Sequence, residues 1–245
     1  MRRVVGSGSK AAFCKHSNLE AHRPKNTSLH CAPRDQIVTA GAAVTIAEIQ
    51  ECLARCGQCL PIRLDLGQPL GGFPGTVGGL VATNMPHALS SQYGSPKEWV
   101  LHMEVLFQGE QAQSGAKVVK SVAGYDVHKL FVGSWGVLGP INTVTFRTYP
   151  LNVLSQGEAV TLRDLQGGEV WILRTLASEL DQALNKAQGV YAFDRPSCTI
   201  WSEMRPEEPS EGWIIGPAGY RWSNRADKGM QIQIKRAFDP EGEWE

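Results

Sequence analysis

The chain has 245 residues, 42% of them hydrophobic, and its 24 Lys and Arg residues balance 24 Asp and Glu residues. This length and composition can bury a full core and fit one large domain with a smaller one attached. The charge balance excludes an overall field that would attract nucleic acid or an anionic membrane. No secretory signal opens the chain, and no apolar run reaches about 18 residues, which predicts a soluble cytoplasmic protein. The six cysteines are expected to be reduced thiols.

The first clear elements are a strand and a helix. Residues 36–42 alternate as a strand that closes on a glycine. Thr45 then predicts a helix N-cap, Glu48 completes a capping box, and Gly57 stands where a left-handed residue ends a helix. The helix has one apolar face, made of Ile46, Ile49 and Leu53. We expect this face to pack on a sheet.

The middle of the chain alternates between loops and strands. Residues 67–79 hold six glycines and two prolines, which predicts a shaped loop suited to binding. Residues 99–107 have the period of two that is typical of a strand, and Gln108 and Gly109 follow as a turn. A further strand is predicted over residues 141–146, and Pro150 suggests a domain boundary.

The remaining residues predict a small α+β unit. An apolar stripe over residues 176–187 indicates a helix, and residues 190–193 indicate a strand. Three tryptophans, Trp201, Trp213 and Trp222, lie in surroundings rich in Pro, Glu and Ser, which indicates a small α+β unit whose elements are joined by loops. The tail over residues 231–242 returns to apolar alternation and ends in a turn.

Three glycine-bearing segments carry the functional signal: residues 5–10 (VGSGSK), 74–79 (PGTVGG) and 122–130 (VAGYDVHKL). The first two offer rows of backbone N–H groups without side chains, as close approach to a diphosphate requires. Lys10 adds a cation, and the Thr76 hydroxyl adds a donor. Neither segment matches the G-x-G-x-x-G fingerprint or the phosphate loop that ends in G-K-[ST], which disfavours a nicotinamide Rossmann site.

These segments resemble, in their order and amino-acid sequence, the FAD-binding domain of the vanillyl-alcohol oxidase (PCMH) type, and so does the segment LFVGSWGVLG at 130–139. Within that family the likeness is strongest to the FAD-binding subunit of bacterial glycolate oxidase. It extends from about Val4 to Pro150. The resemblance implies an α+β, two-subdomain FAD-binding fold over residues 1–150 and a reduced α+β cap over 151–245. A strand and a helix that precede the first loop in relatives are missing here.

The resemblance also implies FAD as cofactor, bound noncovalently because the first loop has no histidine for a covalent link. The residues expected to hold the diphosphate are Gly6, Ser7, Gly8, Ser9, Gly75, Thr76, Gly78 and Gly79. Those expected near the flavin are Asn84, Tyr93 and Gly94. The cofactor bed would be completed by Gly124, Tyr125, Asp126, Lys129 and Ile141. A plain turn at Tyr125 and Asp126, and an ordinary loop cap at Asn84, are the structural alternatives.

Other candidate sites are weaker. Cys52, Cys56 and Cys59 have the spacing of a radical S-adenosylmethionine cluster, but two of them lie on the predicted helix, so ordinary thiols and no metal are favoured. His87 and His102 are possible bases, although a lone histidine is more often structural. Residues 151–245 contain no histidine. No catalytic residue is assigned.

By resemblance, the chain is an FAD-dependent oxidoreductase that acts on CH–OH donors, as the accessory flavin subunit of a 2-hydroxy-acid (glycolate) oxidase complex. Electrons would pass from substrate through the flavin to an iron–sulfur subunit, beside a larger FAD-dependent dehydrogenase subunit, and these partners could bring the chain to the inner membrane. The tail segment at 235–242 (KRAFDPEG) resembles a segment near the end of related flavoproteins and is expected to be structural. The alternatives are a stand-alone FAD enzyme of the same fold, such as a sugar-nucleotide reductase, and a scaffold subunit without flavin.

Overall fold

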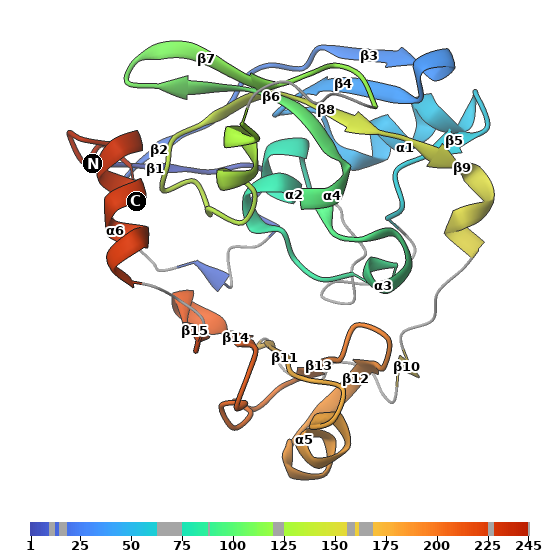
Figure 1. Cartoon of the computed structure of the whole chain (residues 1–245), viewed down its shortest axis with the longest axis vertical. Coiled ribbons are helices and arrows are strands. Elements are labelled where there is room, and N and C mark those ends of the chain that lie inside the picture. The colour runs from blue at the N-terminus through green and yellow to red at the C-terminus, as the bar shows by residue number, and fades with distance from the viewer. Residues whose placement is uncertain are drawn as a thin grey trace.

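The computed structural model describes residues 1–9, 13–14, 19–62, 75–87, 89–119, 125–155, 160–161, 169–224 and 228–244. These residues form two lobes, each built on its own sheet (Figure 1). The larger lobe contains the described residues up to Ser155 and the C-terminal helix and tail. The smaller lobe contains the described residues from Val160 to Ser223. Helices and sheets occur in both lobes, so the predicted α+β class is confirmed.

The larger lobe is organised by a five-stranded antiparallel sheet in the order β3-β4-β8-β6-β7. Its strands are β3 (Leu29–Ala32), β4 (Ile37–Gly41), β6 (Val100–Phe107), β7 (Glu110–Gly115) and β8 (Ile141–Arg147). The strands predicted around residues 36–42, 99–107 and 141–146 are therefore confirmed. In the central pair, Ile37 of β4 lies opposite Arg147 of β8 and Gly41 lies opposite Thr143.

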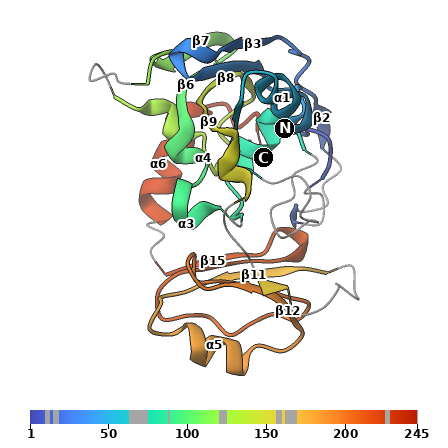
Figure 2. The ribbon, with the colours of Figure 1, turned by 90° about the vertical axis from the view of Figure 1, so that its right-hand side faces the viewer.

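Short helices cover one face of this sheet (Figure 2). They are α1 (Ile46–Ala54), α2 (Val77–Thr83), α3 (Ser90–Tyr93) and α4 (Pro96–Trp99). The predicted capping box is present at α1, where the Glu48 N–H donates to Thr45 Oγ1 at 3.2 Å and the Thr45 N–H donates to Glu48 Oε2 at 2.7 Å. Gly57 has the predicted left-handed conformation, with φ +69. Apolar residues of α1, α2, α4 and the sheet form one core cluster.

Short strands and turns complete the larger lobe. The first strand, β1 (Arg2–Val4), pairs in parallel with β2 (Glu20–His22), and β5 (Gln58–Cys59) pairs with β9 (Tyr149–Pro150). The 3-10 turns are η2 (Pro33–Asp35), η3 (Val127–Leu130) and η4 (Leu151–Ser155).

One thiol pair differs from the sequence prediction. Cys31 on β3 and Cys52 on α1 form a disulfide, so the expectation of reduced thiols is wrong for these two residues. Packing of α1 against β3 brings the two side chains together, and this contact between elements cannot be read from cysteine spacing.

The smaller lobe is a six-stranded sheet in the order β10-β12-β13-β11-β14-β15 with one helix. Its elements are β10 (Val160–Thr161), β11 (Trp171–Arg174), α5 (Leu180–Lys186), β12 (Val190–Asp194), β13 (Thr199–Ser202), β14 (Trp213–Ile215), η5 (Pro217–Gly219) and β15 (Arg221–Ser223). The predicted helix and the strand at 190–193 are confirmed. Trp201, Trp213 and Trp222 lie on β13, β14 and β15 of this α+β unit.

The tail folds as a helix and not as an alternating segment. Helix α6 spans Lys228–Phe238. Ile234 and Phe238, one turn apart, pack against the core of the larger lobe, and the Phe238 ring lies 5.4 Å from the rings of both Phe107 and Phe131. Contact with this core therefore favours a helix here, although the sequence alternates with a period of two. The two chain ends consequently lie close together beside α6 (Figure 1).

The lobes share a second apolar cluster. Phe13 and Met85 from the larger lobe pack with buried residues of the smaller lobe, namely Val170, Ile172, Tyr191, Ala192 and Trp201. Within the described ranges, no helix is both long enough and apolar enough to cross a membrane.

Candidate functional site

One pocket of the larger lobe gathers residues from stretches that lie far apart in the sequence. We distinguish three walls: the first wall from the end of β1 to Ser9, the second wall at the start of α2, and the third wall over residues 135–139. The lining residues include Arg3, Val4, Val5, Gly6, Ser7, Gly8, Ser9, Cys14, Ala42, Thr76, Gly78, Gly79, Thr83, Trp135, Gly136, Gly139 and Ile141.

The first wall is a loop with exposed backbone. The loop begins after Val4, the last residue of β1. The Val5 N–H donates to His22 O at 2.9 Å, and the Arg23 guanidinium donates to Gly6 O at 2.9 Å. Gly8 has φ +81, and no heavy atom lies within 4 Å of the point where a Cβ would stand. Glycine adopts this left-handed conformation readily, whereas other residues are strained there. The main chain at Gly8 is therefore open to an approaching group.

The second wall is fixed against the sheet by backbone hydrogen bonds. The Gly78 N–H donates to Ala42 O at 3.0 Å, and the Val77 N–H donates to Val44 O at 2.9 Å. Thr76 is the N-cap of α2, and its Oγ1 accepts the Gly79 N–H at 3.4 Å. A Cβ on Gly78 would stand 3.1 Å from Ala42 Cβ. The glycine therefore lets this turn pack closely on the end of β4.

The first two walls touch one another. A Cβ on Gly6 would stand 2.9 Å from Thr76 Oγ1, closer than real Cβ atoms approach an oxygen. The Thr76 hydroxyl thus lies directly beside the first glycine loop. The first two of the three glycine segments singled out in the sequence therefore converge on one pocket.

The third wall is attached to both of the others. The Gly133 N–H donates to Val81 O at 3.0 Å, and the Trp135 N–H donates to Ala82 O at 2.8 Å, so the segment runs along α2. Gly136 has φ +86, and a Cβ on it would stand 3.0 Å from Val4 Cβ. The third wall is therefore packed against the last residues of β1.

Half of the predicted site residues line this pocket. They are Gly6, Ser7, Gly8, Ser9, Thr76, Gly78, Gly79 and Ile141. Gly75 directly precedes Thr76, and its carbonyl accepts the Ile46 N–H at 3.0 Å. Gly124 lies outside the described residues.

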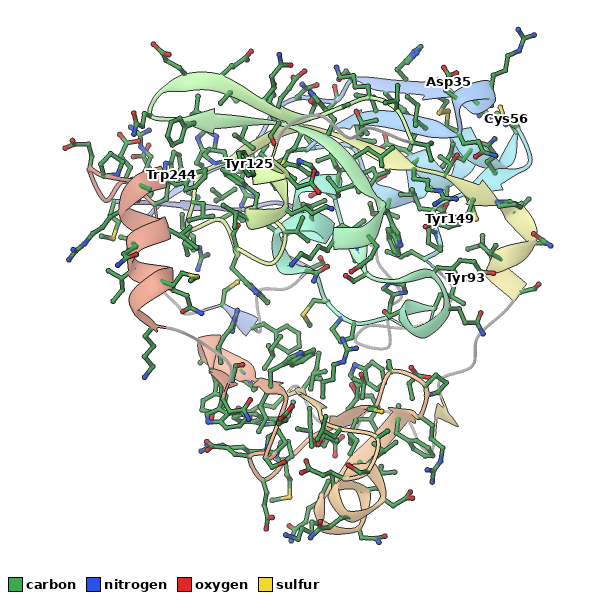
Figure 3. The ribbon with its side chains drawn as sticks, in the orientation of Figure 1. Asp35, Cys56, Tyr93, Tyr125, Tyr149 and Trp244 are labelled. Atoms are coloured by element: carbon green, nitrogen blue, oxygen red, sulfur yellow. A yellow bond between two sulfur atoms is a disulfide. The ribbon has the colours of Figure 1, made fainter. Side chains whose placement is uncertain are left out.

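Asn84, Tyr93 and Gly94 are not among the lining residues. Asn84 ends α2 with φ 44, and its buried Oδ1 has no hydrogen-bond partner within the described part of the chain. Tyr93 ends α3, its carbonyl accepts the Trp99 Nε1–H at 2.6 Å, and its ring lies 5.5 Å from Tyr149 (Figure 3). Gly94 follows it with φ +74. Their place near a flavin stays a prediction.

Tyr125, Asp126 and Lys129 also lie away from the lining residues. Tyr125 is 92% exposed, and Asp126 and Lys129 form an ion pair at 2.5 Å on the surface. Tyr125 instead borders a second cavity beside the β6–β7 hairpin. A contact of these three residues with a cofactor likewise stays a prediction.

The charge near the pocket is positive. Arg3 lines it, and burial raises the pKa of the Cys14 thiol although Arg3 and Arg221 act in the opposite direction. Cys14 is therefore a neutral thiol at neutral pH. Sequence reasoning missed several lining residues: Arg3, Cys14, Trp135, Gly136 and Gly139. The sequence analysis used the segment at 130–139 only for its family likeness. Its glycines Gly136 and Gly139, which line the pocket, are the signal that could have identified this segment as part of the site.

The rival sites do not assemble. Cys52 is bonded to Cys31, and burial raises the pKa of the Cys59 thiol to about 11. In the described ranges, no three His, Cys, Asp or Glu side chains come close enough to hold a metal ion. His87 is buried against Trp99, with ring centroids 5.1 Å apart, and burial lowers its pKa to about 3. Neither His87 nor His102 lines the pocket.

Comparison with known proteins agrees with this geometry. A family model described as an FAD binding domain matches residues 5–114, which include the first two walls. The chain is 27% identical over 216 residues to a D-lactate dehydrogenase of Archaeoglobus fulgidus, covering 88% of this chain and 43% of that protein. It is 31% identical over 119 residues to glycolate oxidase subunit GlcE of Escherichia coli, covering 48% of this chain and 33% of the relative.

Two further likenesses belong with these. The mitochondrial D-lactate dehydrogenase [cytochrome] of Arabidopsis thaliana is 34% identical over 184 residues, 69% of this chain and 31% of that protein. A solved alkyldihydroxyacetonephosphate synthase matches 75% of this chain with a TM-score of 0.49 and 18% identity. The chain spans less than half the length of these relatives. The family match confirms the predicted FAD-binding type over the matched residues 5–114.

Proposed function

We propose that this chain is the FAD-binding subunit of a 2-hydroxy-acid oxidase or dehydrogenase complex that passes electrons from its substrate, through the flavin, to an iron–sulfur partner. The observation that carries this proposal is the convergence of three backbone walls on one pocket in a chain whose residues 5–114 match the FAD binding domain. The relatives support the substrate class, because their names are those of D-lactate dehydrogenases and glycolate oxidase subunits.

The first and second walls would hold the cofactor's diphosphate. Backbone N–H groups near Gly8 can approach phosphate oxygens because no side chain intervenes. The Thr76 hydroxyl, which accepts the Gly79 N–H, can donate its own hydrogen into the pocket. Arg3 lines the pocket, and its positive charge would attract the negatively charged diphosphate. Backbone N–H groups, one hydroxyl and one cation are therefore a suitable set of hydrogen-bond donors for a diphosphate.

The side-chain oxygen of Asn84 could accept a hydrogen bond from a flavin ring. Its Oδ1 is buried at the end of α2 without a partner among the described residues, and a flavin ring carries an N–H that could donate to it. When bound, FAD would supply the acceptor for a hydride from the substrate's hydroxyl-bearing carbon and would release the electrons singly. The protein's own part would be to bind and orient the cofactor.

The binding test uses two glycines that are matched in backbone geometry. Gly8 and Gly109 have φ +81 and φ +80, and neither has a heavy atom within 4 Å of its would-be Cβ. Replacing either by alanine should cost about 1 to 2 kcal/mol of folding stability through left-handed strain. Only Gly8→Ala should weaken FAD binding, by about tenfold in a fluorescence titration, since Gly109 lies at the β6–β7 turn. Equal FAD affinity in both variants would contradict the proposed site.

The substrate class needs a second test. The FAD-loaded protein should be co-purified with candidate dehydrogenase and iron–sulfur subunits and mixed anaerobically with glycolate or D-lactate. Bleaching of the flavin absorbance, followed by reduction of the cluster, is the expected result. Bleaching by NADPH without a 2-hydroxy acid would favour the stand-alone enzyme. A colourless protein that takes up no FAD but still binds both subunits would favour the scaffold.

A further inference from the structure

The residues after α6 form a compact turn around one buried carboxylate. Asp239 is 6% exposed, and it accepts the N–H groups of Glu243 at 2.7 Å and Trp244 at 3.0 Å. It also pairs with the Lys235 ammonium. Burial of the carboxyl group opposes its ionisation, but the hydrogen bonds from Lys235, Trp244 and Glu243 outweigh this effect and lower the pKa of Asp239. The turn is therefore built on a charged pair at neutral pH.

Lys235 connects this turn to the third wall of the pocket. Its Nζ donates to Val137 O and to Trp244 O, both at 2.6 Å, in addition to the Asp239 carboxylate. An ammonium group has three hydrogens, so these contacts use all of its donors. Val137 lies between Gly136 and Gly139, which both line the pocket. The lysine thus holds the main chain in the middle of the third wall.

Trp244 connects the same turn to the first wall. It forms a parallel bridge with Arg2, and the Arg2 N–H donates to Glu243 O at 2.5 Å. The Arg2 guanidinium lies 6.0 Å from the Trp244 ring centroid, and the His22 ring packs edge-on at 5.3 Å. Arg2 begins β1, the strand that leads into the first glycine loop (Figure 3 labels Trp244).

We propose that residues 235–244 form a C-terminal clamp that holds the first and third walls in the geometry that binds the cofactor, with Lys235 as the positioning residue. This inference rests on the proposed FAD-binding function. Both walls are loops that contain glycines, Gly6 and Gly8 in the first wall and Gly136 and Gly139 in the third. Their neighbour β1 forms only three residue pairs with β2, which is a short ladder. A clamp that orders both walls before binding reduces the entropy lost when the cofactor binds.

The test compares Lys235→Met with Lys186→Met. Lys186 lies on α5 in the smaller lobe, where it makes an exposed ion pair with Glu207 at 2.9 Å. In hydrogen–deuterium exchange of the FAD-free protein, Lys235→Met should speed exchange of residues 2–8 and 136–139 by about tenfold and leave β11 to β13 unchanged. Its FAD dissociation constant should rise by about tenfold. Lys186→Met should change neither quantity, and Lys235→Arg should restore most of both.

The result can overturn the clamp. Unchanged exchange at both walls in a Lys235→Met protein with a lowered melting temperature would show that the tail only stabilises the fold. If Lys235→Met does not fold by circular dichroism, Asp239→Asn replaces it, and the same two segments must again exchange faster. Wild-type protein that binds no FAD would overturn the proposed function, whereas the exchange measured without FAD still decides whether the tail orders the walls.

Discussion

Arg221 of the smaller lobe lies over the indole of Trp135, with the guanidinium carbon 3.6 Å from the ring centroid. The same arginine donates to Phe13 O at 2.8 Å. Trp135 lines the pocket, and Phe13 belongs to the cluster that the lobes share. One side chain from β15 therefore contacts both the third wall and the apolar interface. The position of the smaller lobe and the shape of the pocket are linked through this contact.

Arg221→Leu should separate the lobes more easily. A close cation–π contact with partial burial is worth about 1 to 2 kcal/mol, so the free energy of unfolding in urea should fall by about that amount. Arg195→Leu is the matched control, because Arg195 lies over Phe193 at 5.7 Å and pairs with Asp181 within the smaller lobe. This exposed contact should cost less than about 0.5 kcal/mol. Equal losses would show that Arg221 does not join the lobes.

Two threonines that cap helices allow an effect on folding stability to be distinguished from an effect on FAD binding. Thr76 caps α2 in the pocket and Thr45 caps α1 outside it, and the two residues form a backbone bridge with each other. Replacing either by valine removes a capping oxygen and should cost about 1 kcal/mol of stability. FAD affinity, measured by fluorescence quenching, should fall about tenfold only in Thr76→Val. A similar loss of affinity in Thr45→Val would mean that helix stability, and not the Thr76 hydroxyl, determines binding.

Acid should destabilise the protein through His87. Burial lowers its pKa to about 3, whereas an unfolded histidine titrates near about 6.5. As pH falls below about 6.5, the unfolded state binds a proton that the folded state does not, so stability decreases toward pH 3. Between pH 7 and pH 5 this single group should account for about 2 kcal/mol.

His87→Asn should remove that part of the pH dependence, since the amide oxygen can replace Nδ1 as acceptor of the Leu89 N–H. Urea unfolding at pH 7 and pH 5 measures the difference between the two conditions. A variant at position 87 with the wild-type slope would show that His87 is not the titrating group.

Gln50 should be a large single contributor to stability. Its buried amide donates to Leu60 O at 2.8 Å and Ile62 O at 2.7 Å and accepts the Leu60 N–H at 2.9 Å. Gln50→Met removes these three hydrogen bonds, although Leu60 O still accepts the Ile62 N–H at 2.7 Å. The substitution should lower the free energy of unfolding by about 2 to 4 kcal/mol. Gln111→Met, at an exposed position of β7, should cost less than about 0.5 kcal/mol. One ordinary hydrogen bond contributes about 1 kcal/mol to stability. If Gln50→Met lowers the free energy of unfolding by less than about 1 kcal/mol, the three hydrogen bonds of Gln50 do not contribute as proposed.

Local signals predicted helix α1 and the strands β4, β6 and β8 of the main sheet in the larger lobe. The capping box at Thr45 and Glu48 and the alternation before Phe107 depend on neighbouring residues only, and both elements form where expected. The tail shows where such signals fail. Ile232 and Ile234 alternate with polar residues, yet α6 forms because Ile234 and Phe238 together reach the core of the larger lobe. Contacts between distant segments decided that choice.

The sequence by itself determined that glycine segments at 6–9 and 75–79 would offer bare main chain to a diphosphate, because a missing side chain is a local property. Only the tertiary structure decided which segment completes the pocket. It placed the glycines near Trp135 on the wall and placed Tyr125 and Tyr93 elsewhere. It also brought Lys235 to Val137, 98 residues earlier in the chain. Such approaches depend on how sheets and helices pack, and no spacing along the chain encodes them.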